Sequence, residues 1–197
     1  FKGRKNIKEL ISQMTLEEKA SLCSGLDFWH TKGVERLGIP SEMVCDGPHG
    51  LRKQDDASDH LGINNSIKAV CFPAGCATAS SFNRDLVRKL GETLGEECQA
   101  EHVSTILGSA MNIKRSPLCG RNFEYFSEDP YLTKELAVPF IQGVQTWDVA
   151  ACVKHFAVNN QETERLWVDV EVDENALRQI YLPAFYDAVR KGHSYTI

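Results

Sequence analysis

The 197-residue chain has no long hydrophobic run and no long run of basic residues. The first absence argues against a transmembrane segment, because about 20 consecutive apolar residues are needed to cross a bilayer. The second, with a net charge of −5, argues against a nucleic-acid or membrane-surface partner. Hydrophobic residues make up 42% of the chain and charged residues 25%, which is ordinary for one globular domain or part of a larger one.

Cysteine pairs of the Cys-x-x-Cys kind are also missing, although the chain has seven cysteines. Zinc sites and thioredoxin-like exchange sites depend on such pairs, so both are disfavoured. An odd number of scattered cysteines favours reduced thiols in a cytoplasmic protein. No signal peptide is visible, but the chain begins at Phe1, which leaves open a removed signal sequence. We expect no metal and no cofactor.

Short apolar strands alternate with helical patterns, and no Asn-Gly hairpin signal lies between them. This alternation predicts a parallel α/β sheet, either in a barrel or doubly wound. The predicted strands are residues 41–44, 103–107 and 149–153, with another beginning at residue 195. The predicted helices are residues 7–22, 83–100, 132–144 and 173–191. Residues 55–66 and 114–129 are expected to be a surface loop and an irregular segment.

Local signals set the ends and faces of these helices. Residues 15–18 (Thr-Leu-Glu-Glu) form a capping box, which predicts a break in the first helix. Asn83 is expected to cap the second helix, and Pro183 predicts a kink or break in the last. The residues expected to face the core are Ile7, Leu10, Ile11 and Met14, then Leu86, Leu90 and Leu94, then Leu177, Ile180, Tyr181, Phe185 and Val189.

Charged side chains follow the predicted strands directly. Asp46, Arg121 and the pair Lys154 and His155 each come just after a strand. In barrels and in doubly wound sheets, ligands bind at the carboxyl ends of the strands. Carboxylates and the head groups of Arg and Lys hold paired hydroxyls through charge-assisted hydrogen bonds. The pattern therefore indicates a carbohydrate site.

Each of these residues also has a structural interpretation. An Asp before Gly-Pro commonly stabilises a turn, and Arg121 can form an ion pair with Glu124 or Glu128. Two basic groups at a buried strand end are harder to explain structurally, because they need local partners. Cys152 is not a candidate nucleophile for His155, since side chains three residues apart on a strand point to opposite faces.

Four segments carry a resemblance over essentially the whole chain. They are residues 14–19 (Met-Thr-Leu-Glu-Glu-Lys), 46–52 (Asp-Gly-Pro-His-Gly-Leu-Arg), 112–124 (with Asn-Ile-Lys-Arg-Ser-Pro and Gly-Arg-Asn-Phe-Glu) and 154–165 (with Lys-His-Phe and Asn-Asn-Gln-Glu). On these residues the chain resembles the β-glucosidases of glycoside hydrolase family 3. The last two segments are long and specific, whereas the first is weak alone.

The resemblance implies a fold and an activity. The fold is a partial TIM-type (β/α) barrel over residues 1–197, truncated before the later strands and without the family's second α/β sandwich domain. The activity is retaining hydrolysis of terminal β-D-glucosyl residues from a β-glucoside or oligosaccharide. The substrate-binding residues that it implies are Asp46, Arg52, Arg121, Lys154, His155 and Arg165.

The catalytic carboxylates that the family uses have no counterpart in these residues. Retaining hydrolysis needs two carboxyl groups about 5 Å apart, a nucleophile and an acid/base. The family's nucleophile is an Asp that usually precedes Trp, and this chain has no Asp-Trp step. Glu124, Glu162 and Glu164 match neither catalytic position. The resemblance therefore implies that the nucleophile Asp and the acid/base Glu lie beyond Ile197, and that the 197 residues are a fragment that holds sugar-binding residues and is inactive alone.

Two other interpretations remain. The chain can be a non-catalytic sugar-binding or pseudoenzyme module, which binds glucose as a stable, folded unit. A doubly wound nucleotide-binding domain ranks last, because residues 46–50 lack the glycine spacing of a phosphate loop. The sequence leaves the exact sugar, the aglycone and the oligomeric state unknown.

Overall fold

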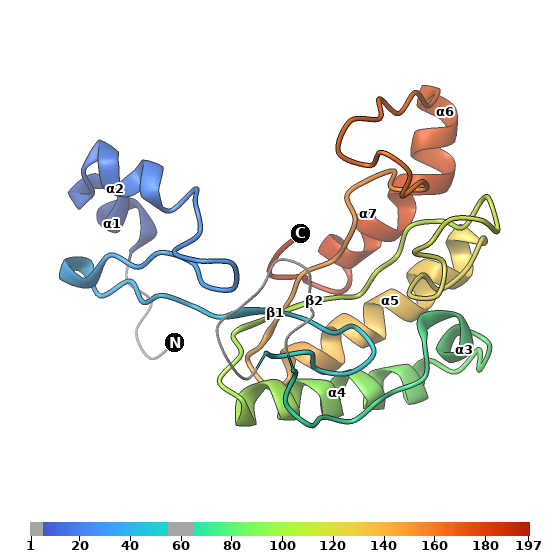
Figure 1. Cartoon of the computed structure of the whole chain (residues 1–197), viewed down its shortest axis with the longest axis horizontal. Coiled ribbons are helices and arrows are strands. Elements are labelled where there is room, and N and C mark those ends of the chain that lie inside the picture. The colour runs from blue at the N-terminus through green and yellow to red at the C-terminus, as the bar shows by residue number, and fades with distance from the viewer. Residues whose placement is uncertain (1–5, 55–64) are drawn as a thin grey trace.

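The computed structural model describes residues 6–54 and 65–197 (Figure 1). Its elements, in chain order, are α1 (Ile7–Gln13), α2 (Leu16–Ser21), η1 (Glu35–Leu37), β1 (Val44–Asp46), α3 (Gly75–Ala79), α4 (Arg84–Ala100), β2 (Thr105–Leu107), α5 (Pro130–Gln145), β3 (Ala150–Ala151), α6 (Glu174–Ala176), η2 (Leu177–Tyr181) and α7 (Leu182–Arg190). The polar loop expected at residues 55–66 lies, except for its last two residues, outside the described residues.

The three strands form a parallel sheet, as the alternating pattern predicted, and their order in it is β1-β2-β3. Cys45, Ile106 and Ala151 lie side by side across it and are all buried, whereas their neighbours along each strand are partly exposed. One face of the sheet is thus fully covered. Beyond β3, Cys152 pairs in parallel with Thr196, where another strand was expected to begin.

Helix α5 packs between α4 and α7 and also contacts β3 (Figure 1). The buried core joins this helical layer to the covered face of the sheet, through residues such as Leu94, Ile106, Leu136, Ile141 and Ala151. A parallel sheet needs such a layer, because the helices of its crossover connections lie on its faces. The layer fixes the strands, and the ends of the strands carry the loops of the site.

The first predicted helix is two helices, as the capping box indicated. The Thr15 hydroxyl accepts from the Glu18 N–H at 3.2 Å, and the Glu18 carboxylate accepts from the Thr15 N–H at 2.9 Å. The predicted inward stripe is only partly right. Met14 is buried in a small cluster of its own with Val34 and Leu37, but Ile7 and Ile11 are exposed. The described neighbours of α1 cover only its Leu10–Met14 side.

Asn83 caps α4 as predicted, because its Oδ1 accepts from the Leu86 N–H at 3.0 Å. The predicted buried face is wrong at Leu86, which is exposed. The buried stripe is instead Val87, Gly91, Leu94, Gly95 and Cys98. A Cβ on Gly91 of α4 would lie 2.5 Å from the Phe140 carbonyl oxygen of α5. The close packing of α5 against α4 therefore requires a glycine at position 91. A pattern of leucines alone misses a face built around glycine.

The last predicted helix breaks where Pro183 indicated. A π-helical turn at Leu177–Tyr181 separates α6 from α7, and Pro183 lies in the first turn of α7. Tyr181 and Phe185 are buried as expected, but Ile180 and Val189 are exposed. The wider π turn rotates the side-chain pattern relative to a continuous α-helix, so a single 3.6-residue period misplaces part of the face.

Candidate functional site

A pocket of about 570 Å³ lies at the carboxyl ends of the strands. Asp46, the last residue of β1, lines it on one side. Arg121 and Glu124 enter from the irregular segment after β2, and Lys154 and Arg165 from the segment after β3. The structure thus brings together side chains that are up to 119 residues apart in the sequence, at the edge of the sheet where ligands of such folds bind.

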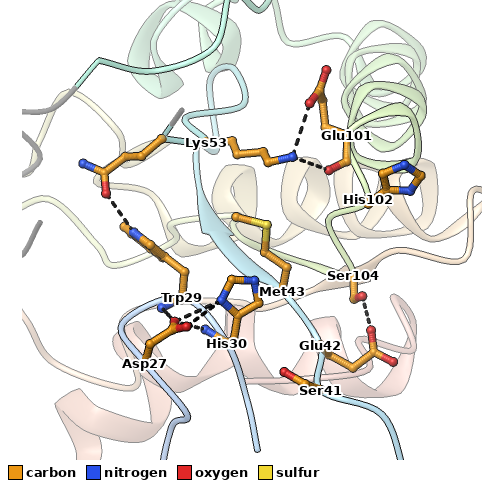
Figure 2. A pocket seen from close by; sticks show the side chains of 11 residues that line it. Asp27, Trp29, His30, Ser41, Glu42, Met43, Lys53, Glu101, His102 and Ser104 are labelled. Carbon is orange, nitrogen blue, oxygen red and sulfur yellow. Dashed lines mark hydrogen bonds and ion pairs between the residues drawn. The ribbon is translucent and has the colours of Figure 1, made fainter. Parts of the chain in front are cut away.

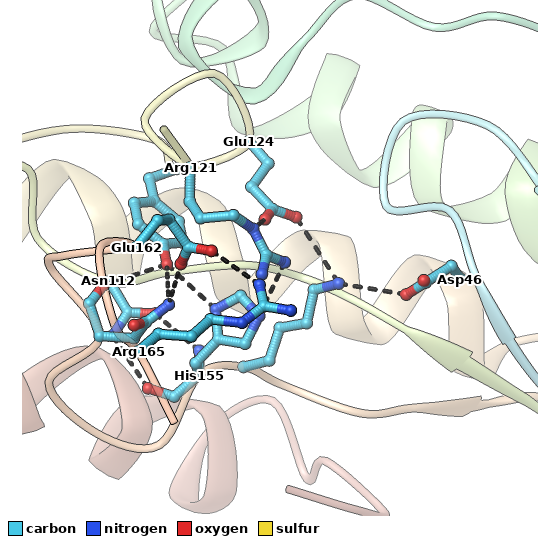
Figure 3. A network of polar contacts seen from close by, with 10 residues as sticks. Asp46, Asn112, Arg121, Glu124, His155, Glu162 and Arg165 are labelled. Carbon is cyan, nitrogen blue, oxygen red and sulfur yellow. Dashed lines mark hydrogen bonds and ion pairs between the residues drawn. The ribbon is translucent and has the colours of Figure 1, made fainter. Parts of the chain in front are cut away.

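Lys154 lies between two carboxylates, those of Asp46 and Glu124, which are labelled in Figure 3. Its Nζ lies 3.4 Å from Asp46 Oδ1 and 3.6 Å from Glu124 Oε2. The other carboxylate oxygen of Glu124 accepts from Arg121 Nε. The Lys154 side chain is 14% exposed and that of Glu124 only 4%, so these charges interact with little screening by water. The local partners that Lys154 needs are therefore present.

The structural interpretation of Arg121 named an ion pair with Glu124 or Glu128. The structure contains this ion pair, and the partner is Glu124. Burial alone would lower the pKa of Arg121, but the hydrogen bond and the negative charge of Glu124 outweigh it, so the pKa is raised. Arg121 also lines the pocket. Its structural and ligand-facing roles are therefore compatible, because the pair fixes a guanidinium that borders the open space.

His155 is held in one tautomer. Arg121 Nη2 lies 2.9 Å from His155 Nε2, and a guanidinium has only donors, so Nε2 accepts. The ring proton therefore sits on Nδ1 and is donated to the Tyr125 hydroxyl at 3.0 Å, which in turn donates to the Asn159 carbonyl at 3.1 Å. Burial, then the charges of Arg121 and Lys154, lower the pKa of His155 to about 4. At neutral pH this imidazole is uncharged and orients Arg121.

Asn112 and Tyr125 support His155 from the buried side, and sequence reasoning did not single them out. The Asn112 side chain accepts from the His155 N–H at 2.6 Å and donates to the carbonyl oxygens of His155 and Ala157, each at 2.9 Å. Both residues are almost fully buried. Their signal in the sequence was their place in the two motif segments, Asn112 before Ile-Lys-Arg-Ser-Pro and Tyr125 directly after Gly-Arg-Asn-Phe-Glu.

Arg165 is tethered at the rim of the pocket. Its Nη1 lies 2.7 Å from Glu162 Oε2, and Glu162 Oε1 accepts from the Asn159 side chain at 2.9 Å. Burial acts to raise the pKa of Glu162, but these hydrogen bonds from Asn159 and Arg165 outweigh it and leave the pKa lowered. The Arg165 side chain remains half exposed, so its head group is available to a ligand.

Arg52 closes the loop that carries Asp46. Its backbone N–H donates to the Asp46 carbonyl at 3.0 Å, and its side chain lines the pocket. Gly47 has φ +129°, and a Cβ there would lie 2.1 Å from the Gly50 carbonyl oxygen. Only glycine permits this tight turn. The backbone of Arg52 thus braces the loop that carries Asp46, besides the place of Arg52 on the pocket wall.

Aromatic side chains complete the wall. Phe28, Trp29 and Phe123 line the pocket, and the rings of Phe28 and Trp29 meet edge to face at 4.7 Å. Trp29 Nε1 donates to Gln54 Oε1 at 3.0 Å, which fixes its indole. Aromatic rings beside charged donors suit a ligand with both apolar faces and hydroxyl edges. No local pattern in the chain indicated that residues 28 and 29 lie near residue 121.

Residues 6–54 and 65–197 contain no cluster of three or more His, Cys, Asp or Glu side chains arranged to hold a metal ion. In the same residues, no helix is long and apolar enough to cross a membrane. The seven cysteines are all free thiols, and burial raises the pKa of Cys45 and Cys98 to about 12.

A charged, aromatic-walled pocket at the carboxyl ends of parallel strands defines an α/β protein of the kind that includes (β/α) enzymes. Residues 55–196 match the family described as "Glycosyl hydrolase family 3 N terminal domain". The chain belongs to glycoside hydrolase family 3, as its motif segments indicated.

Relatives and solved structures agree with this assignment. The chain is 62% identical over 192 residues to "Thermostable beta-glucosidase B" of Acetivibrio thermocellus, a match that covers 98% of this chain and 25% of the relative. It is 51% identical over 188 residues to an "Exo-alpha-(1->6)-L-arabinopyranosidase" of Bifidobacterium longum, a match that covers 95% of this chain and 25% of that relative. The chain thus spans about a quarter of the length of these curated relatives.

The fold is also that of family members. The structure of β-glucosidase 3B from Thermotoga neapolitana in complex with glucose superposes with a TM-score of 0.88 at 42% identity, covering 97% of this chain and 28% of that one. The predicted α/β class is therefore confirmed, and the small parallel sheet described above is part of that fold.

Proposed function

We propose that this chain supplies the glycosyl-binding part of a β-glucosidase-type active site. The observation that carries the proposal is the convergence of Asp46, Arg121, Lys154 and Arg165 on one pocket. The 62% identity to a β-glucosidase supports the same activity class. Residues 1–197 then make up the N-terminal part of a TIM-type barrel domain and do not include the family's second domain.

The groups in the pocket suit a sugar ring. Asp46, whose side chain is 39% exposed, offers carboxylate acceptors to a pair of hydroxyls. Lys154 and Arg165 offer donors from the segment after β3, and Arg52 lies on the wall beside Asp46. His155 acts through its hydrogen bond to Arg121, which it keeps turned in one direction. The aromatic rings of Phe28 and Trp29 supply an apolar wall.

Binding without hydrolysis is the expected behaviour of the 197 residues. Both carboxylate oxygens of Glu124 are engaged, one by Arg121 and one by Lys154, so Glu124 is not poised to attack a sugar. The sequence also holds no Asp-Trp step. Without a nucleophile and an acid/base about 5 Å apart, retaining hydrolysis does not proceed.

The catalytic carboxylates themselves are proposed to lie beyond Ile197. Thr196 pairs in parallel with Cys152 next to β3. In a barrel, the carboxyl end of each further parallel strand lies at the same face as the pocket. A nucleophile Asp that follows Ile197 on such a strand would therefore face the residues that bind the sugar. This position stays a prediction, and the chimera below tests it because it supplies that part of the chain.

The first test uses the 197-residue chain itself. Isothermal titration with glucose should show binding, and an aryl β-D-glucoside should show no turnover. A folded chain that binds no glucose would contradict the proposed site, and measurable turnover would contradict the proposed inactivity.

A chimera separates an active-site part from a non-catalytic sugar-binding module. In it, residues 1–197 replace the matching quarter of the Acetivibrio thermocellus enzyme. The chimera should hydrolyse aryl β-D-glucosides if these residues belong to an active site. A folded, glucose-binding chimera without activity would favour the module.

The arabinopyranosidase relative favours a second candidate sugar. An α-L-arabinopyranoside is a pentopyranoside, so it lacks the hydroxymethyl group of a glucoside. Comparing kcat/KM of the chimera on the 4-nitrophenyl glycosides of the two sugars decides between them. The proposal of a glucoside holds if the β-D-glucoside is the better substrate.

A further inference from the structure

Glu124 lies at the centre of the charged network, although nothing in the sequence marks it as a ligand-binding residue. One of its carboxylate oxygens accepts from Arg121 Nε, and the other lies 3.6 Å from Lys154 Nζ. Its side chain is 4% exposed, so it has little room to contact a sugar. What it does contact are two cations that border the pocket.

The backbone of Glu124 is as firmly placed as its side chain. Its N–H donates to the Arg121 carbonyl at 3.1 Å, and the preceding carbonyl, of Phe123, accepts from the Cys76 N–H of α3 at 3.3 Å. A Cβ on Gly75 would lie only 2.3 Å from the Glu124 carbonyl oxygen. The start of α3 therefore presses directly on this segment, which fixes the point from which the carboxylate reaches.

The negative charge of Glu124 compensates the positive charges of Arg121 and Lys154. Arg121 and Lys154 both approach this carboxylate and both border the pocket, so without it two partly buried cations repel each other with little screening by water. Removing one partner of a buried ion pair leaves an uncompensated charge, which moves or draws in water. Asp46 neutralises Lys154 only from the other side.

We propose that Glu124 is a positioning residue, which sets the head groups of Arg121 and Lys154 and, through Arg121, the tautomer of His155. The proposal rests on the proposed function for its effect on sugar binding. Its effect on Arg121 and His155 is a property of the free protein and is measured without any sugar.

The first test is spectroscopic. In the full chain carrying ¹⁵N-labelled histidine, the His155 ring should give the signature of a neutral imidazole protonated at Nδ1. Glu124→Gln keeps the shape and removes the charge, and Glu124→Ala removes both, so each should add a second tautomer. Glu128→Gln, an exposed change of the same charge in the same segment, is the matched control and should leave the spectrum unchanged. An unchanged His155 spectrum in either folded Glu124 variant overturns the proposal.

The second test measures glucose affinity of the full chain by titration. Glu124→Gln should weaken binding about tenfold, the size of one charge-assisted hydrogen bond, and Glu128→Gln should not. In an Arg121→Met background the same Glu124→Gln change should cost clearly less, because the group through which it acts is gone. Equal costs in both backgrounds contradict the positioning role. If the unsubstituted chain binds no glucose, the proposed function fails, while the tautomer test still decides the role of Glu124.

Discussion

Two polar pockets lie beside β1, and they differ in how their charges are satisfied. The larger, of about 660 Å³, lies at the starts of the strands and is lined by residues such as Asp27, His30 and Glu42 (Figure 2). Its Asp27–His30 pair is local, three residues apart, with side chains 48% and 40% exposed. The pocket at the strand ends instead pairs Lys154 with Asp46 and Glu124 across long stretches of sequence.

The difference indicates what marks a site in this fold. Exposed ion pairs contribute little, about 0–1 kcal/mol, and tolerate the loss of a partner. Buried charges from distant segments are costly to assemble, and their presence at strand ends calls for a role beyond stability. In the larger pocket, Lys53 and Ser104 join the walls through hydrogen bonds to the Glu101 carbonyl and the Glu42 carboxylate. Of the two pockets, the one with the smaller volume is the one that gathers the buried charges from distant segments.

The largest contrast is expected from removing one lysine in each pocket. Lys154→Ala deletes a charge-assisted donor that faces the proposed sugar, so glucose affinity of the chain should fall by at least about a hundredfold, or roughly 3 kcal/mol. Lys53→Ala, at the other pocket, should leave affinity within about twofold. Titration calorimetry on the two variants gives both values. A loss below tenfold for Lys154→Ala would argue against its assignment to the glycosyl site.

The free energy of unfolding should also respond differently to substitutions at the two ends of the sheet. Asn112→Ala leaves the buried N–H of His155 and two carbonyl groups without their partner, so the free energy of unfolding should drop by about 3 kcal/mol. His30→Ala removes a half-exposed local pair and should cost less than about 1 kcal/mol. Urea denaturation followed by circular dichroism measures both. Equal losses in the free energy of unfolding would mean that the hydrogen bonds of Asn112 stabilise the fold no more than an exposed local pair does.

The third contrast is with pH. The pKa of His155 is about 4 in the folded chain and near 6.5 when unfolded. Between these values the unfolded state binds more protons, so the stability contributed by neutral His155 is complete above pH 6.5 and is lost as the pH falls toward 4. Unfolding free energy should decline by about 2 to 3 kcal/mol over that window. His155→Gln should flatten the slope, and a slope that persists in the variant would assign it to other groups.

How much of this was predictable differs between fold and site. The parallel sheet, the caps at Thr15 and Asn83 and the break at Pro183 followed from local signals, which depend on a few neighbouring residues. The exposed Leu86 and Ile180 did not, because a glycine-lined helix face and a π turn depend on what packs against them. Local patterns carry no information about a partner that comes later in the chain.

The site shows the same limit. Asp46, Arg121, Lys154 and His155 could be selected because each stands in a polar motif at or after a predicted strand end, whereas Arg52 and Arg165 were implied only by the family resemblance. Their mutual arrangement could not, nor could the way Glu124 is shared between Arg121 and Lys154. A carboxylate three residues from an arginine looks like a local pair in the sequence, and only the fold brings a lysine from 30 residues further on to its second oxygen.

The smallest effect is expected where the strand-start pocket is tied together. Lys53 Nζ donates to the Glu101 backbone carbonyl at 2.8 Å and lies 3.4 Å from Glu101 Oε2. Glu101→Gln removes the charge but keeps the carbonyl, which is the shorter contact. The change should therefore cost less than about 0.5 kcal/mol, and the difference should shrink in 1 M salt, because the Glu101 side chain is 40% exposed and its charge is screened. Urea denaturation of both proteins at low and high salt measures it. A cost above about 2 kcal/mol that persists in salt would show that this pocket, too, depends on a buried charge, and the contrast between the two ends of the sheet would fail.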